Sequence, residues 1–317
     1  MTEPIDEIVK KKPSRFADFT RRLVKEKPLA TIGGVIVIFM FLVGIFANFL
    51  SPYPYDENQI KIRLQPPSVE HILGTDQLGR DQLSRIIWGA RVSMIVGVAG
   101  AALSTVIATL IGLLSGFYGG KFDIIMQRFV DGWMSFPALF LVLSIMSLVG
   151  PGLMQVILVL GLLMGIAQSR IVRSAVIGIK RNIYVEASKA IGASDITILI
   201  RHILPNIMAP IIVIFTLAMG TAILGEATLS FLGFGIPPPM PTWGSMLSVE
   251  GRTYMYQATW LAIWPGVALG VVVWGINMFG DGLRDLLDPR LRGGLGRYGN
   301  MGLGKKAGKK AKLKPTA

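Results

Sequence analysis

Long uncharged stretches alternate with short charged ones along this chain, and the uncharged stretches are long enough to cross a lipid bilayer. The first, residues 29–50, has 22 residues without a charge. At about 1.5 Å per residue, a helix of that length covers roughly 33 Å, more than the hydrocarbon core of about 30 Å. The other uncharged stretches are residues 92–118, 132–169, 205–225 and 253–280. The pattern predicts membrane-spanning helices.

The stretch at residues 132–169 has 38 residues and is too long for a single span. Gly150-Pro151-Gly152 divides it, and such a sequence is typical of a tight turn between two helices. The division gives six helices, and only helices or closed barrels satisfy backbone polar groups within a bilayer. A signal peptide explains the first stretch poorly, because Asn48-Phe49-Leu50-Ser51 offers no small-residue cleavage site. We therefore expect an all-α polytopic membrane protein with six transmembrane helices.

Basic residues predict how these helices are oriented. If both termini are cytoplasmic, the internal segments hold 26 of the 32 Lys and Arg residues and the external segments hold 6. This split follows the positive-inside rule. The net charge of +13 is then mostly a consequence of topology, and the distribution of basic residues around helix ends does not favour nucleic-acid binding.

Composition excludes several other classes. Only 16% of the residues are charged, against about 25% in soluble domains, so the chain lacks the polar surface of a water-soluble globule. There is no cysteine, which removes disulfides, thiol nucleophiles and thiolate metal sites. His71 and His202 lie far apart in sequence and do not suggest a metal centre. We expect no bound cofactor and no metal site.

The predicted organisation follows from the spans. It comprises a cytoplasmic N-terminal segment (1–28), a first transmembrane helix (29–50), an external loop with a short helix (51–91), a five-helix core (92–281) that includes a cytoplasmic loop (170–206), and a cytoplasmic basic tail (282–317).

The cytoplasmic loop at residues 170–206 has the pattern of two short helices. Asn182 can cap the first helix, and Gly192 can end it in a left-handed conformation. Ser194 or Asp195 then starts a second helix, which we expect to stop at Leu204-Pro205.

Small residues surround the joint between these two helices. Ala187 and Ser188 would let another backbone approach closely. An ordinary amphipathic connector on the membrane surface explains the same pattern equally well, so the residues alone leave a docking role open.

A resemblance favours the docking role. Glu186-Ala187-Ser188, then Gly192, then Leu204-Pro205 resembles the EAA motif of ABC importer permeases, with Ser188 in place of Ala. A histidine at the position of His202 is similar to the pattern of the peptide-importer branch of that family. The resemblance implies that this loop docks into an ATPase subunit, with Glu186 and its small neighbours at the contact and Gly192 at the bend.

Three further blocks agree with the same branch. Gly74-Thr75-Asp76-Gln77-Leu78-Gly79-Arg80-Asp81 resembles the C-type permease of dipeptide, oligopeptide and nickel importers. Glu226-Ala227-Thr228-Leu229-Ser230 and Gly280-Asp281-Gly282-Leu283-Arg284 are similar to it as well. The resemblance covers roughly residues 15 to 292. It implies the six-helix architecture of a type I importer permease in a prokaryotic cell membrane.

The same resemblance implies an assembly. It comprises a second, B-type permease subunit, one or two ATPase subunits that bind ATP and Mg, and an external substrate-binding protein. This chain would be no enzyme itself. Di- or oligopeptides are the expected substrate, with nickel or an oligosaccharide as alternatives in the same family.

Five residues outside the loop are candidates for transport roles. Glu226 lies at the outer end of the fifth span, where an ionisable group is costly and often functional, so it could face the path or an outer gate. A carboxylate hydrogen-bonded to the loop at residues 231–243 is the alternative. Arg80, Asp81, Arg85 and Trp243 are candidates for external docking of the binding protein.

An ion-coupled transporter and an intramembrane enzyme are the alternatives from other functional classes. An ion-coupled secondary transporter normally carries acids near midplane and repeated halves, and neither is evident in these spans. An intramembrane enzyme would need a catalytic motif such as His-Glu-x-x-His or Gly-x-Ser-x-Gly, and the chain has neither.

Overall fold

The computed structural model describes residues 15–287, and within this range the chain is helical without a named strand. The long helices are α2 (Pro28–Ile45), α4 (Gln82–Tyr118), α7 (Leu153–Lys180), α10 (Met208–Phe231) and α13 (Trp260–Leu287). Each is long and apolar enough to cross a membrane, α10 together with the helical turns before it. Most of the expected basic tail and part of the N-terminal segment lie outside the described residues.

The remaining helices are shorter and connect or flank the long ones. They are α1 (Arg15–Glu26), α3 (Ala47–Leu50), η1 (Ile60–Ile62), α5 (Gly120–Met134), α6 (Ala138–Val149), α8 (Ile183–Ala190), α9 (Asp195–Ile198), η2 (Leu199–Ile203), η3 (Leu204–Ile207), α11 (Trp243–Ser245), η4 (Met246–Gly251) and α12 (Arg252–Tyr254).

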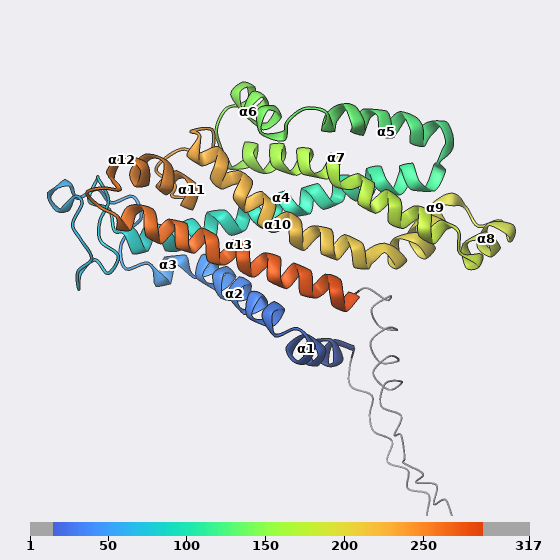
Figure 1. Ribbon diagram of the computed structural model, residues 1–317, viewed down its shortest axis with the longest axis horizontal. Coiled ribbons are helices and arrows are strands. Elements are labelled where there is room, and N and C mark those ends of the chain that lie inside the picture. The colour runs from blue at the N-terminus through green and yellow to red at the C-terminus, as the bar shows by residue number, and fades with distance from the viewer. Residues whose placement is uncertain (1–14, 288–317) are drawn as a thin grey trace, which may run out of the picture.

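The long helices run side by side along the longest axis of the molecule (Figure 1). α4 packs along α7 and α10, and α2 packs on α13 and α4. Glycine permits the closest of these contacts, as expected for helix packing in membranes. A Cβ at Gly112 of α4 would lie 2.6 Å from the carbonyl oxygen of Ser169 of α7, and one at Gly33 of α2 would lie 2.4 Å from that of Gly275 of α13.

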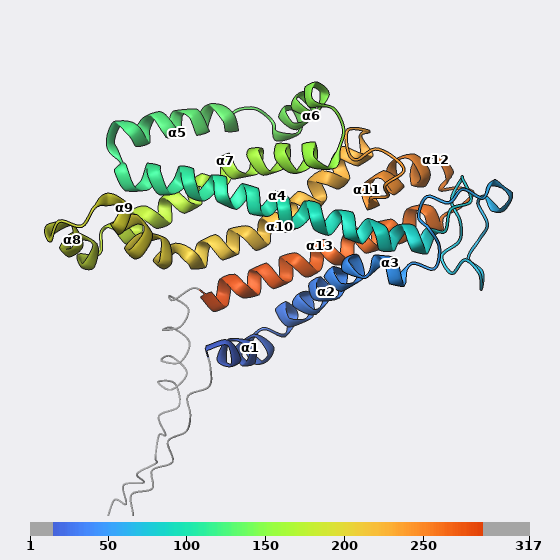
Figure 2. The same ribbon diagram turned by 180° about the vertical axis from the view of Figure 1, so that it is seen from behind.

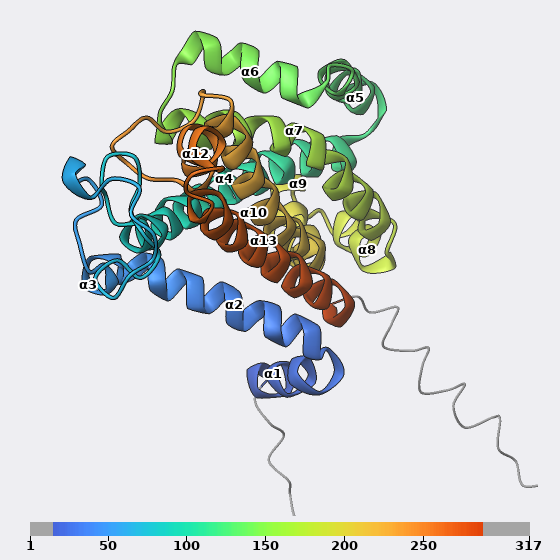
Figure 3. The same ribbon diagram turned by 60° about the vertical axis from the view of Figure 1, so that its left-hand side comes forward.

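The third expected span is not one straight helix. α5 and α6 together are apolar enough to span, but they bend by 86° at the break between them. Pro137 is the last residue of this break, and proline both lacks an N–H group and disfavours helical backbone in the residue before it. The pair forms a separate outer layer beside α7 (Figure 3).

Two other expected boundaries are corrected. α4 begins at Gln82, inside the segment expected to be an external loop, because the side chain of Asp81 caps it by accepting from Ser84 N at 2.8 Å. The chain also stays helical through Leu204-Pro205, which was expected to be a stop. Pro205 lies in the first turn of η3, a tight 3-10 turn that follows the π turn of η2, and such irregular turns accommodate its missing hydrogen bond.

Two regions of short helices lie at opposite ends of the bundle (Figures 1 and 2). One is residues 181–207, which contain α8 and α9 and which we call the inner loop after its predicted cytoplasmic side. The other is residues 242–254, which contain α11, η4 and α12 and which we call the outer insert. The segment at residues 51–81 lies beside the outer insert.

Candidate functional site

The inner loop has the local structure that its sequence predicts. Gly192 has φ +85°, the left-handed conformation that ends α8. Ser194 caps α9, and its side chain accepts from Thr197 N at 3.3 Å. Asn182 occupies the cap position of α8, but its side chain makes no capping hydrogen bond there. The bend between α8 and α9 is therefore set by Gly192 and Ser194.

The motif residues of the inner loop divide into an exposed and a packed set. Glu186 and Ala187 are exposed. Ser188 is half-buried, since its Oγ donates to Tyr184 O at 2.8 Å and lies 3.3 Å from His202 Nε2. His202 thus links α8 to η2 and η3, the turns that lead into α10. Leu204 is half-buried behind it, and Pro205 is exposed.

An apolar surface surrounds the exposed part of the motif, and sequence reasoning missed it. Ile183, Ile191, Ile196 and Ile200 are all exposed, with Ile191 85% accessible. Beneath them, Val185 and Ile198 are buried and anchor the two helices to the bundle. Exposed apolar side chains gathered in this way mark contact with another protein or with the membrane. The alternation of exposed and buried isoleucines along the loop was the signal available in the sequence.

At the opposite end, Trp243 is fully buried. Its Nε1 donates to Ile86 O of α4 at 3.2 Å. Its ring is so close to α4 that a Cβ at Gly89 would lie 2.9 Å from its Cδ1. Gly244 packs against the backbone of Ala227 of α10 in the same way. The outer insert is therefore wedged between the outer ends of α4 and α10.

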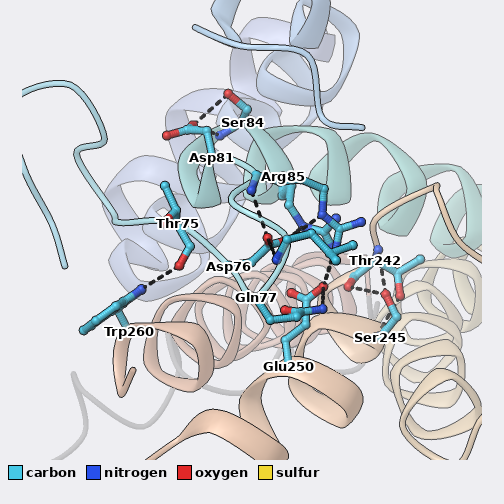
Figure 4. A network of polar contacts seen from close by, with 12 residues as sticks. Thr75, Asp76, Gln77, Asp81, Ser84, Arg85, Thr242, Ser245, Glu250 and Trp260 are labelled. Carbon is cyan, nitrogen blue, oxygen red and sulfur yellow. Dashed lines mark hydrogen bonds and ion pairs between the residues drawn. The ribbon is translucent and has the colours of Figure 1, made fainter. Parts of the chain in front are cut away.

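Four charged side chains are buried together at the same end of the bundle, and they come from two distant segments (Figure 4). Arg80 Nε donates to Asp76 Oδ2 at 2.6 Å, and Arg80 Nη2 donates to Glu250 Oε1 at 2.7 Å. Arg85 Nη2 also donates to Glu250 Oε1 at 2.7 Å, and its Nε lies 3.4 Å from Asp76 Oδ2. Two arginines face two carboxylates, so the formal charges balance. We call these four residues the buried charge cluster.

Burial raises the pKa of the Glu250 carboxyl, and the neighbouring guanidinium of Arg85 opposes that shift. The ionised form of Glu250 thus depends on the two arginines that contact it. Glu250 is the sole acid between residues 230 and 257, which was the signal in the sequence that reasoning from motifs overlooked. Asp76 was seen in its motif but not assigned a role.

Asp81 serves the segment before α4 and does not reach the outer insert. Its Oδ2 accepts from the backbone N and the Oγ of Ser84, both at 2.8 Å. Its Oδ1 lies 2.9 Å from His71 Nδ1. The structure therefore corrects the expectation of an external docking surface at Arg80, Asp81, Arg85 and Trp243. All four are buried, because each fills a packing or pairing role between α4, its preceding segment and the outer insert.

Glu226 is fully buried near the outer end of α10. Its Oε1 accepts from Ser230 Oγ at 2.6 Å, and Thr242 Oγ1 donates to Ser230 Oγ at 3.3 Å. The carboxylate is therefore linked to the start of the outer insert, which matches the alternative of a carboxylate bonded to the loop. It does not face an open surface of this chain.

The described residues contain no group of three or more His, Cys, Asp or Glu side chains that could hold a metal ion.

Comparisons with known proteins identify relatives over most of the chain. The family model of the binding-protein-dependent transport system inner membrane component matches residues 108–293. The model of the N-terminal TM domain of oligopeptide transport permease C matches residues 14–67.

Individual proteins agree with these models. The chain is 40% identical over 272 residues to a putative peptide transport system permease protein of Brucella suis biovar 1, covering 86% of this chain and 91% of that protein. It is 41% identical over 269 residues to a dipeptide transport system permease protein of Alkalihalophilus pseudofirmus, covering 85% and 88%. It is 39% identical over 287 residues to an oligopeptide transport system permease protein of Bacillus subtilis, covering 90% and 93%.

A solved structure supports the fold. The chain superimposes on one from inward-facing conformations of the MetNI methionine ABC transporter with a TM-score of 0.53 and 19% sequence identity. The match covers 64% of this chain and 96% of the other.

Proposed function

The chain belongs to the family of binding-protein-dependent transport system inner membrane components, and we propose that it supplies half of the translocation path of an ATP-driven peptide importer. As a member of that family it is a multi-pass permease of the bacterial inner membrane. The family description implies an external binding protein and an ATPase as partners. In this proposal a B-type permease completes the path, and one or two kinds of ATPase subunit carry ATP and Mg.

The proposed contact with the ATPase is the exposed face of the inner loop. Glu186 and Ala187 of the motif lie on it together with Ile183 and Ile191, all of them exposed. Buried Ile198 fixes this face to the helix bundle. A rigidly attached apolar face with a carboxylate suits docking into a groove of another protein, because apolar burial supplies affinity and the charge sets orientation. This exposed face is the observation that carries the proposal.

The bend at Gly192 and the contact of Ser188 with His202 support a lever-like role for the same loop. The Ser188–His202 contact joins α8 to the turns that lead directly into α10. Movement of a docked α8 would therefore be passed to a membrane-spanning helix. In this scheme, ATPase closure moves α8 and α10 follows.

Peptides are the proposed substrate class. The relatives carry the names of peptide, dipeptide, oligopeptide and glutathione permeases, and each of these ligands contains amide-linked amino acids. This shared chemistry favours a peptide over the nickel or oligosaccharide alternatives. No ion-coupled transporter is among these names.

The test is a single charge placed on the exposed face of the inner loop. Ile191→Asp should abolish co-purification of the ATPase and reduce ATP-dependent peptide uptake at least tenfold, because a carboxylate would have to be desolvated at the contact. Ile72→Asp is the matched control, because Ile72 is an exposed isoleucine at the opposite end of the helix bundle. It should leave the ATPase bound.

Uptake is measured in vesicles that hold the complete complex, with and without vanadate or ATP. Uptake that follows an ion gradient with no ATPase bound to the wild type would overturn the proposed function. An ATPase that binds Ile191→Asp as well as the wild type would overturn the assignment of the docking face.

A further inference from the structure

The buried charge cluster joins two segments that are far apart in the sequence. Arg80 and Arg85 precede or begin α4, whereas Glu250 lies on η4 of the outer insert, 170 and 165 residues away. Each of the three side chains is at most 6% exposed. These two contacts are therefore a direct polar connection between the outer end of α4 and the segment that leads into α13.

Such a cluster contributes little net free energy to the stability of the fold. Removing four ionised groups from water carries a desolvation penalty that can exceed their mutual attraction, and apolar residues of similar volume often stabilise a fold as well. What ionic pairing adds is a defined relative position of the groups that carry the charges. The cluster is therefore better suited to fixing geometry than to holding the fold together.

The hydrogen bonding within the cluster is unevenly distributed. Arg80 Nη2, Arg85 Nη2 and, at 3.4 Å, Gln77 Nε2 all donate to one oxygen of Glu250, Oε1. The other oxygen, Oε2, and Nη1 of Arg85 have no hydrogen-bond partner among the described residues. A buried network with an unused donor and an unused acceptor has the capacity to pair in more than one way. Oε2 is thus available to accept a hydrogen bond if the Glu250 carboxylate turns, and such a turn leaves the charge balance unchanged.

The backbone around Glu250 is suited to such a change. η4 is a π turn, a rare form that occurs disproportionately at functional sites. The outer insert also contacts the outer ends of three spans, α4, α10 and α13. A displacement of the outer end of α4 relative to that of α13 would therefore alter or break contacts of the insert.

We propose that Glu250 is a positioning residue for transport, which holds the outer insert against the outer end of α4 and so couples the movements of α4 and α13. Its carboxylate exchanges partners between Arg80 and Arg85 as these helices move. The inference rests on the proposed function, since it concerns how engagement of the binding protein at the outer face reaches the spans.

The decisive comparison is Glu250→Gln against Asp81→Asn in the complete complex. Both remove one buried carboxylate from the same end of the helix bundle by a nearly isosteric change. Only Glu250 bridges to the outer insert, whereas Asp81 bonds within residues 71–84. The readout is the ratio of ATPase activity with binding protein and peptide to basal activity, per assembled complex.

Per assembled complex, Glu250→Gln should lose at least tenfold in uptake and show a stimulation ratio close to one. Asp81→Asn should lower the yield of complex and keep the stimulation ratio within twofold of wild type. Equal ratios in the two variants, or a Glu250→Gln complex that is stimulated normally, would overturn the inference.

Arg80→Lys covers the case in which Glu250→Gln fails to assemble. Lysine keeps the charge but lacks the fork that spans Asp76 and Glu250 together. This variant should assemble and show a stimulation ratio between the wild-type value and one, and an unchanged ratio would also overturn the inference.

The position of the insert can be measured directly, because the chain contains no cysteine. Spin labels on cysteines introduced at exposed Asp56 and Thr253 would report the distance between the external segment and the insert. Glu250→Gln should broaden this distance distribution relative to the wild type. Asp81→Asn should leave the distribution narrower than Glu250→Gln does. A wild-type complex without any stimulation would count against the proposed function itself, whereas normal stimulation of both wild type and Glu250→Gln would remove only the role of Glu250.

Discussion

The inner loop and the outer insert both connect membrane-spanning helices, yet they place their side chains in opposite ways. The inner loop exposes isoleucines such as Ile183 and Ile191 to its surroundings. The outer insert buries Trp243 and the charged Glu250 inside the chain. The inner loop therefore leaves apolar side chains uncovered by this chain, whereas the outer insert obtains its contacts from its own chain.

This difference indicates where each region derives its stability. Apolar side chains left in water at the inner loop add little to folding and become favourable only when another surface covers them. The outer insert has the reverse arrangement, because its contacts with α4 and α10 already exist before any partner binds. Substitutions in the outer insert should therefore affect the chain itself, and substitutions on the exposed inner loop should affect assembly.

Trp243→Ala should have the largest effect on stability. Loss of this fully buried side chain should cost about 3–5 kcal/mol, because it leaves a cavity and removes the hydrogen bond from the indole to Ile86 O. The check is the thermal unfolding midpoint of the purified chain in detergent. Tyr256→Ala is the control, since that ring is 94% exposed beside the same insert. Equal midpoints for the two variants would mean that the insert is not anchored by Trp243.

Ile198→Ala tests the same contrast within the inner loop. Ile198 is buried and Ile196, two residues earlier, is 67% exposed. Truncation of Ile198 should cost about 3 kcal/mol, because a buried side chain is lost. Ile196→Ala should leave the unfolding midpoint almost unchanged and weaken ATPase binding in a pull-down titration. If Ile196→Ala destabilises the isolated chain as much as Ile198→Ala, the inner loop is not an uncovered surface.

Gly192→Ala should have the smallest effect of the three. A Cβ at φ +85° should cost about 1 kcal/mol from backbone strain alone, since no atom lies within 4 Å of the added group. We expect a small fall in the unfolding midpoint together with a measurable loss of ATPase binding, because the angle between α8 and α9 changes. Gly178→Ala is the control, a helical glycine of α7 with equally open surroundings and no positive φ. A lower midpoint for Gly178→Ala than for Gly192→Ala would show that strain at the bend is not the cause.

Local features of the chain could be predicted where the cause lies within a few residues. The end of α8 at Gly192 and the start of α9 at Ser194 depend on the conformational freedom of glycine and on a side-chain cap, and both were predicted. Proline was harder to interpret. Pro205 was expected to end a helix and instead lies within irregular helical turns, whereas Pro137 lies in a break that was not expected. The effect of proline depends on whether neighbouring helices hold the chain on one axis, which a local pattern does not contain.

The sequence by itself determined that this chain crosses a membrane several times, because uncharged stretches of spanning length leave few other stable arrangements. It also carried the motif of the inner loop, which is read from consecutive residues. Only the tertiary structure decided that Arg80 and Arg85 are buried rather than exposed, and that Glu250 is their partner. The physical reason is that a charged residue is either solvated or paired, and the choice depends on a carboxylate 165 or more positions away that only helix packing brings within 2.7 Å.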